Sequence, residues 1–303
     1  MCKNAPKKGK PAWLKKRLPL GNDYQRVKNI LSDARLSSVC QAANCPNMFE
    51  CFSKNTSTFM ILGSECTRHC RFCNVTAGAP LPLDPDEPVR VARTAHQLGL
   101  TYVVVTSVTR DDLPDGGAAH FAAVIAAIKT GQATPGDWKK TEEKKRDPVA
   151  RVEVLIPDFQ GDIKALEIVV RAKPDVINHN IETVASLYEK VRPEAQYLRS
   201  LDLLKNAKAL DPAIPVKSGI MVGLGETTAQ VIQTLEDLFN HGCDIVTIGQ
   251  YLQPTRAHLG VKKYYSPEEF NQLEQAAQTL GFSRVAAGPF VRSSYNAQDL
   301  FNA

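Results

Sequence analysis

From Thr58 onward, short apolar or β-branched runs alternate with longer stretches in which apolar residues recur every three or four positions. Buried parallel strands give continuous apolar runs, whereas amphipathic helices give the longer period. The predicted strands are Thr58–Leu62, Tyr102–Thr106, Val152–Ile156, Val176–Asn178, Pro215–Met221 and Ile245–Ile248. The predicted helices between them are Val89–Leu98, Ala118–Lys129, Ile163–Ala172, Thr183–Val191, Leu201–Leu210 and Thr228–His241.

Six strand–helix repeats of this kind predict an α/β fold, namely a partial (β/α)6 barrel of the TIM type. The repeats place this barrel at residues 56–275. Residues 1–55 lack the alternation and form a predicted N-terminal extension, and residues 276–303 form a predicted C-terminal arm. The stretch Gly131–Asp147 has no apolar period, so we expect a surface loop there.

Composition adds limits to this picture. The chain has 303 residues, 43% of them hydrophobic, which is enough for a sizeable core. No uninterrupted apolar stretch approaches the roughly 18 residues of a membrane helix, and no apolar signal segment follows the basic N-terminus. We therefore expect a soluble cytoplasmic protein that does not enter the membrane.

The charge pattern gives little information about binding partners. The net charge is +5, and the first seventeen residues hold seven Lys or Arg and no acid. This tail could steer an acidic protein partner, although a solvated tail without a function fits equally well. It lacks interleaved aromatic residues, so nucleic acid binding is not indicated.

Cysteines carry the first chemical signal. Six of the eight fall in one short window, at positions Cys40, Cys45, Cys51, Cys66, Cys70 and Cys73. Clustered thiols in a long chain more often hold metal or perform catalysis than form disulfides. Cys2 and Cys243 stand apart and receive no assignment; Cys243 adjoins an apolar run, where a buried free thiol is common.

The second half of this window follows the first predicted strand, where a barrel places its active-site loops. Three thiolates at Cys66, Cys70 and Cys73 can hold an iron–sulfur cubane and leave one iron open. An open coordination position usually marks a reactive metal centre. The alternative is a zinc site in which His69 completes a tetrahedron.

The loop Cys66-Thr-Arg-His-Cys70-Arg-Phe72-Cys73 resembles the CxxxCxΦC signature of the radical S-adenosylmethionine (SAM) superfamily, with Phe72 as its aromatic residue. The resemblance implies that the open iron of a 4Fe-4S cluster chelates SAM. The segment Gly219-Ile-Met-Val-Gly223-Leu-Gly225-Glu226 resembles the glycine-rich segment that packs on the adenosyl group in this superfamily. Glycine-rich turns are common, so this segment supports the loop and would not suffice alone.

The upstream spacing Cys40-x4-Cys45-x5-Cys51 resembles the auxiliary-cluster motif of the lipoyl synthase family, with zinc or three free thiols as the alternatives. Arg292-Ser293-Ser294-Tyr295 resembles the C-terminal motif of the same family. The resemblance implies a second 4Fe-4S cluster whose fourth ligand is Ser294, in preference to Ser293. A hard serine oxygen should dissociate from such a cluster more readily than a thiolate. Asn296 departs from the histidine of many members, which affects packing of the arm.

Three internal stretches also resemble this family: Val104–Gly117, Asn178–Thr183 and Val191–Ser200. Several of their polar residues lie near predicted strand ends, where they could line the cavity and hydrogen-bond the cofactor. These candidates are Ser107, Asn178, Asn180, Glu182 and Arg199. Caps or buried hydrogen-bond networks are the alternative roles for each.

The resemblance implies insertion of two sulfur atoms at C6 and C8 of an octanoyl chain attached to a lysine. These carbons bear no acidic proton and no leaving group, so the reaction needs a radical that a cofactor supplies. The implied partners are octanoylated lipoyl carrier domains, in 2-oxoacid dehydrogenase E2 subunits and the glycine cleavage H protein, and a ferredoxin or flavodoxin electron donor. The rivals are another sulfur-inserting radical SAM enzyme, of the biotin synthase or methylthiotransferase type, and a two-cluster electron carrier.

Overall fold

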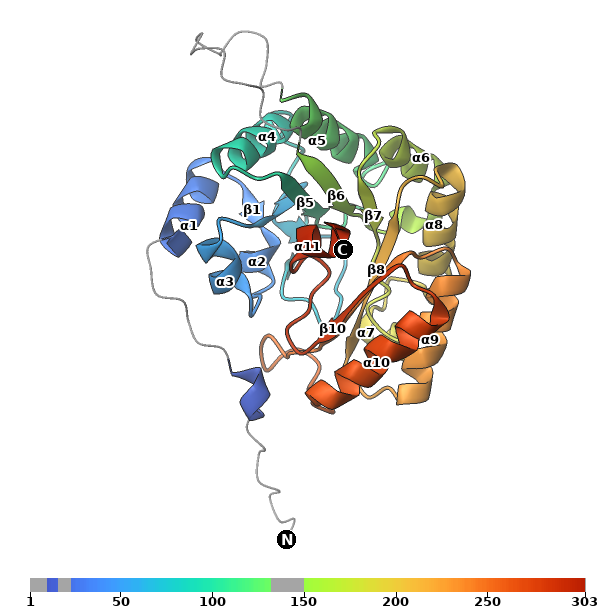
Figure 1. Cartoon of the computed structure of the whole chain (residues 1–303). Coiled ribbons are helices and arrows are strands. Elements are labelled where there is room, and N and C mark those ends of the chain that lie inside the picture. The colour runs from blue at the N-terminus through green and yellow to red at the C-terminus, as the bar shows by residue number, and fades with distance from the viewer. Residues whose placement is uncertain (1–9, 16–22, 132–149, 303) are drawn as a thin grey trace.

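The computed structural model describes residues 10–15, 23–131 and 150–302, which build an open α/β barrel (Figure 1). One sheet has the order β1-β2-β5-β6-β7-β8-β9-β10, and β3 and β4 form a small separate sheet. All neighbours in the large sheet run parallel except β1, which is antiparallel to β2. The strands are β1 (Ser37–Ser38), β2 (Thr58–Ile61), β3 (Glu65–Cys66), β4 (Thr76–Ala77), β5 (Tyr102–Ser107), β6 (Arg151–Leu155), β7 (Val176–Asn178), β8 (Val216–Val222), β9 (Ile245–Gln250) and β10 (Arg284–Gly288).

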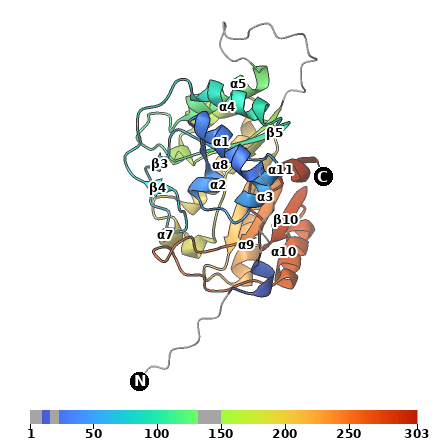
Figure 2. The same cartoon turned by 90° about the vertical axis from the view of Figure 1, so that its left-hand side faces the viewer.

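Helices surround the sheet on its outer side, as Figures 1 and 2 show. The α-helices are α1 (Asp23–Asp33), α2 (Val39–Ala42), α3 (Met48–Ser53), α4 (Glu87–Gln97), α5 (Ala118–Thr130), α6 (Ile163–Arg171), α7 (Tyr188–Val191), α8 (Tyr197–Leu210), α9 (Thr228–Asn240), α10 (Pro267–Leu280) and α11 (Ala297–Asn302). Short 3-10 helices lie at Ala12–Leu14, Phe159–Gly161 and Ala185–Leu187. None of the helices in the described part of the chain is long and apolar enough to cross a membrane.

All six predicted strands are confirmed to within two residues at each end. Their side chains are buried on both faces, completely so in β2 and β9, because helices cover the outside and the barrel interior is packed. The predicted partial barrel is thus confirmed. The loop expected at Gly131–Asp147 lies almost wholly outside the described residues.

Four elements differ from the prediction, namely α7, α8, β10 and α10. Helix α8 begins at Tyr197, before the predicted start at Leu201. The helix predicted at Thr183–Val191 starts later, because Glu182 has a positive φ of 65° and Val184 is extended. A 3-10 turn then leads into α7. In addition, β10 extends the sheet by a seventh parallel strand, and α10 crosses the predicted boundary at residue 275. We therefore start the C-terminal arm after Gly288.

The arm crosses the gap between the two edges of the open sheet. It leaves the carboxyl end of β10 at Gly288 and finishes in α11, which contacts the amino end of β5. There the ring of Phe301 lies 5.6 Å from that of Tyr102, and Gln298 bonds the hydroxyl of Thr101. The arm therefore runs from the carboxyl ends of the strands to their amino ends.

Candidate active site

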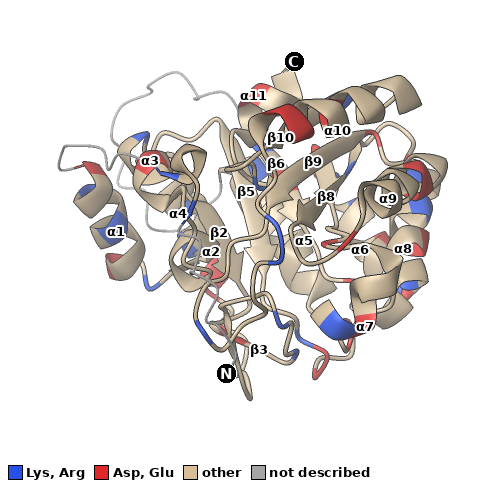
Figure 3. Ribbon diagram, turned by 90° about the horizontal axis from the view of Figure 1, so that it is seen from below, with Lys and Arg blue, Asp and Glu red and all other residues tan. Residues whose placement is uncertain are grey.

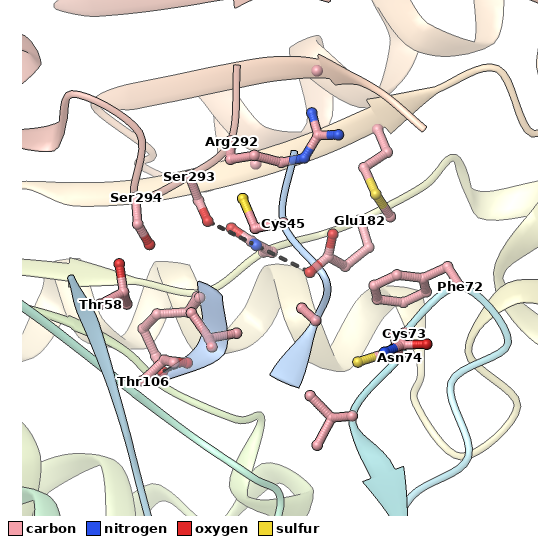
Figure 4. A pocket seen from close by; sticks show the side chains of 18 of the residues that line it. Cys45, Thr58, Phe72, Cys73, Asn74, Thr106, Glu182, Arg292, Ser293 and Ser294 are labelled. Carbon is pink, nitrogen blue, oxygen red and sulfur yellow. Dashed lines mark hydrogen bonds between the residues drawn. The ribbon is translucent and has the colours of Figure 1, made fainter. Parts of the chain in front are cut away.

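A cavity of about 450 Å³ lies at the carboxyl ends of the strands. Both predicted cysteine sets and both serines of the arm line it, although they come from opposite ends of the chain. Figure 4 shows Cys45 and Cys73, one from each set, with Ser293 and Ser294. The site residues in its lining are Cys40, Cys45, Cys51, Cys66, Cys70, Phe72, Cys73, Ser107, Asn180, Glu182, Ser293 and Ser294. The structure thus brings together the two halves of the predicted site.

The loop that carries Cys66, Cys70 and Cys73 is held from both sides by main-chain contacts. The N–H of Arg71 donates to the carbonyl of Val191 at 2.9 Å, and the N–H of Leu259 donates to the carbonyl of Arg71 at 3.2 Å. His258 Nε2 lies 2.9 Å from the carbonyl of Cys73. These contacts fix the loop backbone without using its thiols.

Arg68 anchors the same loop from within. Its guanidinium donates to Asp111 at 2.6 and 2.9 Å and to Asp158 at 2.6 Å. The side chains of Arg68 and Asp158 are 3% and 0% exposed, so each buried charge needs the other to offset its loss of hydration. The cysteine loop is therefore tied to the loops after β5 and β6 by one buried cation.

Burial governs the protonation of these thiols. It raises the pKa of Cys70, and it raises the pKa of Cys73 to about 12. The sulfur of Cys66 instead accepts the N–H groups of Arg68 and Thr109, at 3.5 and 3.3 Å. A metal that binds here must displace protons from Cys70 and Cys73, so assembly of the site should be favoured at higher pH.

The second cysteine set sits on the N-terminal helices beside β2. Cys40 lies in α2 and Cys51 in α3, and the turn between them carries Cys45. The N–H of Cys45 donates to the carbonyl of Cys40 at 3.0 Å, and Asn44 adopts a φ of 51°, which turns the chain back. Burial raises the pKa of Cys40.

The arm is fastened to these helices on both sides of its serines. Asn47 donates to the carbonyl of Phe290 at 2.7 Å, and the Tyr295 hydroxyl donates to Glu50 at 2.8 Å. Between these points Ser294 points into the cavity (Figure 4). Its hydroxyl makes no hydrogen bond to any described residue, which leaves the oxygen available as a ligand.

Neither cysteine set converges on a single point. Among the described residues, which include all six of these cysteines, no three Cys, His, Asp or Glu side chains are placed to share one metal ion. A cubane takes each thiolate on a different iron, so its ligands are spread around it. The described side chains therefore present no preformed site for a single zinc ion.

Four predicted cofactor-binding residues lie in the cavity wall: Phe72, Ser107, Asn180 and Glu182. The Ser107 hydroxyl and the Asn180 Oδ1 are buried without a partner in the described structure. Burial raises the pKa of Glu182, whose carboxylate accepts from Asn180 at 3.0 Å. Orphaned buried polar atoms are costly, so this wall fits a polar ligand that would pair with them.

Asn178 and Arg199 do not line the cavity. Asn178 donates to Glu153 at 3.1 Å, in a buried network that also holds Lys217 and Tyr102. Arg199 faces Asp158 at 3.4 Å. In this structure Asn178 belongs to a buried hydrogen-bond network, and Arg199 is a half-buried partner of Asp158.

The Gly223–Glu226 turn also lies outside the cavity lining, and its polar groups hydrogen-bond within the turn itself. The Glu226 carboxylate accepts the N–H groups of Gly223, Leu224 and Gly225. A Cβ on Gly223 would lie 2.2 Å from the Gln250 amide, so packing demands glycine there. The part of the glycine-rich segment that reaches the cavity is Gly219–Met221.

Two arginines of the cavity wall were missed by the sequence analysis. Arg192 donates to the Asn180 carbonyl and the Tyr188 hydroxyl, and its Nε is buried without a partner among the described residues. Arg292 is half-buried near Cys45 and Glu182, and its partial desolvation lowers its pKa. Positive charge in this wall offsets the charge that thiolates and clusters bring. Arginine side chains are usually exposed, so nothing in the sequence indicated that these two line the cavity, apart from the family motifs in which they lie.

Comparison with known proteins places this site in a class. Residues 60–238, more than half of the chain, match a profile described as the radical SAM superfamily. Residues 2–45 match a profile described as the N-terminal domain of lipoyl synthase. Among solved structures, HydG, a maturase of the FeFe-hydrogenase, aligns with a TM-score of 0.57 over 88% of this chain and 67% of its own, at 13% identity. Methylornithine synthase (PylB) aligns with a TM-score of 0.51 over 89% and 75%, at 14% identity. The fold and cysteine loop are those of a radical SAM enzyme.

Closer relatives narrow the class. The chain is 55% identical to lipoyl synthase of Caldanaerobacter subterraneus subsp. tengcongensis over 288 residues, or 95% of each chain. It is 52% identical to lipoyl synthase of Alkaliphilus metalliredigens over 96% of each chain. It is also 53% identical to lipoyl synthase of Xylella fastidiosa, over 95% of this chain and 74% of that one. The chain belongs to the lipoyl synthase family.

Proposed function

We propose that this enzyme inserts sulfur at C6 and C8 of an octanoyl chain attached to a lysine of a carrier protein. One observation carries the proposal: two three-cysteine sets and Ser294 line a single cavity. A hydrogen-abstracting site and a sulfur source must both reach the same alkyl carbon, so a shared cavity is what the reaction requires.

The residues present fit two clusters and SAM. Cys66, Cys70 and Cys73 would hold the first cluster, and Cys40, Cys45, Cys51 and Ser294 the second. Asn180, Glu182 and Arg192 offer the polar groups that SAM would need between them. When bound, the first cluster and SAM supply a hydrogen-abstracting radical, and the second cluster supplies sulfur.

The chain itself positions the substrate and excludes water. Met60, Leu155 and Ile220 contribute apolar side chains to the cavity wall, a surface suited to an alkyl chain. An enclosed apolar wall also limits quenching of a carbon radical by other groups. Ser294 would hold the second cluster through an oxygen, which is a weaker ligand for such a cluster than a thiolate.

We further propose that lipoyl domains of 2-oxoacid dehydrogenase E2 subunits and the glycine cleavage H protein present the octanoyl chain. A ferredoxin or flavodoxin would supply electrons. Figure 3 shows acidic and basic segments interspersed on the outer helices, so the described helices do not single out a docking face of one sign. None of the seven cysteines in the described part of the chain forms a disulfide, which fits the reducing cytoplasm.

The proposal is tested by reconstituting the protein without oxygen, counting iron and sulfide, and supplying reductant, SAM and an octanoyl-lysyl peptide. Two cubanes per chain and a dithiolated peptide are expected. One cubane per chain, or two cubanes without thiolated peptide, would refute it; the second outcome would favour an electron carrier.

The division of labour between the cysteine sets is tested by a matched pair of variants. C70A should abolish cleavage of SAM, because it removes a ligand of the first cluster. C45A should retain SAM cleavage and lose thiolation of the peptide, because it removes a ligand of the second. Equal loss of cleavage in both variants would mean that the roles are misassigned.

A further inference from the structure

Asn180 connects the two halves of the cavity by a single amide group. Its Nδ2 donates to Glu182 at 3.0 Å and to the hydroxyl of Ser293 at 3.2 Å, as the dashed lines in Figure 4 show. An amide nitrogen carries two hydrogens, so both bonds can exist together. Glu182 faces the first cysteine set, whereas Ser293 belongs to the arm that carries Ser294.

The Ser293 hydroxyl, in the middle of the arm, accepts a hydrogen bond from the barrel residue Asn180. The contacts at Phe290 and Tyr295 fasten the arm to the N-terminal helices. Among the described residues, the side chain of Ser293 bonds only that of Asn180. The Asn180 amide therefore helps to place the peptide that carries Ser294, together with the contacts at Phe290 and Tyr295.

The Asn180 side-chain amide can still accept a hydrogen bond. Asn180 Oδ1 is buried without a partner in the described structure, and a Cβ on Gly219 would lie only 2.8 Å from it. A ligand donor that bonds Oδ1, or a ligand hydroxyl that bonds Glu182, would fix the amide in the orientation that also serves Ser293. Linked hydrogen bonds of this kind strengthen one another.

We propose that Ser293 and Asn180 are positioning residues that couple occupancy of the SAM site to the hold of Ser294 on the second cluster. This inference rests on the proposed function. Bound SAM and a seated arm favour the same orientation of Asn180, so each strengthens the other, and linkage makes the effect reciprocal. The enzyme thereby keeps its sulfur source intact when a radical is about to be made.

The coupling is measured as SAM affinity, by anaerobic equilibrium dialysis, in proteins with and without the second cluster. Removing the cluster by C45A should weaken SAM binding about threefold to tenfold, the range that one hydrogen bond supplies. S293A should weaken binding by a similar factor and make it insensitive to C45A. S293T, which keeps the hydroxyl, should behave as the wild type. An unchanged C45A effect in the S293A background would overturn the inference.

A second measurement needs no variant at Ser293. SAM should slow the extraction of iron from the second cluster by a chelator in the wild-type holoenzyme, and equal extraction rates with and without SAM would overturn the coupling. If the wild type holds two cubanes and binds SAM but shows no coupling, only this inference falls. If it holds one cubane or binds no SAM, the proposed function falls with it.

Discussion

At the scale of single residues, Arg68 is the position on which the cysteine loop depends most. Replacing Arg68 by Met would leave the Asp158 carboxylate buried, with the N–H of Gln160 and the longer contact to Arg199 as its partners. Breaking a buried pair in this way typically costs about 3–5 kcal/mol. R68M should therefore lower the melting temperature and reduce iron bound at the first cluster, measured by calorimetry and iron analysis.

The matched control is R71M, because Arg71 is exposed on the same loop and contributes only backbone bonds. It should load and melt as the wild type. R68K, which keeps the charge without the planar fork, should fall between the two. Normal iron content and a normal melting temperature in R68M would contradict the claim that the Arg68 ion pairs hold the cysteine loop in place.

His179 gives the residue scale a pH dependence. Burial, with Arg192 nearby, lowers its pKa to about 4, well below its ordinary value. Nδ1 lies 2.8 Å from the Ile156 carbonyl and Nε2 3.0 Å from the Ser200 hydroxyl, which suits a neutral ring. The unfolded chain binds the proton more readily, so stability is complete above the ordinary pKa and is lost as pH falls toward the folded value.

We therefore expect the free energy of unfolding to lose up to about 1.4 kcal/mol per pH unit from this residue between roughly pH 6.5 and 4. H179Q is less stable at every pH but should lack this share of the slope. Melting temperatures measured from pH 7.5 to 5 on both proteins provide the check, and parallel curves would count against a neutral buried histidine.

What the sequence could say about residues follows from how local the signal is. Cys66, Cys70 and Cys73 share one loop, so their spacing alone indicates a metal site. Arg68 and Arg192 find their partners on distant loops, and no spacing encodes that. Asn178 and Asn180 looked equivalent in sequence, yet only Asn180 lines the cavity. Asn178 is the last residue of β7, whereas Asn180 lies in the loop that follows, so strand periodicity does not set its direction.

At the scale of elements, the arm packs directly against a glycine of the barrel. A Cβ on Gly249, near the end of β9, would lie 2.2 Å from the Val291 carbonyl and 3.1 Å from the Arg292 guanidinium. G249A should therefore displace the arm and Ser294 with it. We expect the variant to keep the first cluster and to lose iron from the second, measured by iron count and by the SAM cleavage that remains.

G260A is the matched control, because a Cβ on Gly260 meets nothing within 4 Å. It should load both clusters. Full iron content in G249A would show that the contact between Gly249 and the arm is not needed for binding of the second cluster.

Elements were predictable where burial is uniform along them. The six predicted strands are apolar on both faces, so the runs stand out in the sequence. β10 was missed because Arg284–Gly288 is short, contains small residues and is only half-buried at the sheet edge. The late start of α7 was hidden because the positive φ of Glu182 is imposed by its pairing with β8 and has no local signal.

At the scale of the whole molecule, the open barrel explains how residues from both ends of the chain share one site. The N-terminal helices stand beside β2, the arm crosses from β10, and the cysteine loop follows β2 (Figure 1). Sequence spacing indicated each part, whereas the resemblance to the lipoyl synthase family was needed to join Ser294 to Cys40, Cys45 and Cys51. The structure places all four in the lining of one cavity.

The central claim is that the second cluster gives its sulfur to the substrate. The most direct measurement is mass spectrometry of the peptide product after one turnover of enzyme reconstituted with isotopically labelled sulfide, with unlabelled sulfide in the buffer. Labelled sulfur at both C6 and C8 in the wild type, with no thiolated product from C45A, is the predicted result. Unlabelled sulfur in the product, or labelled product from C45A, would contradict the account.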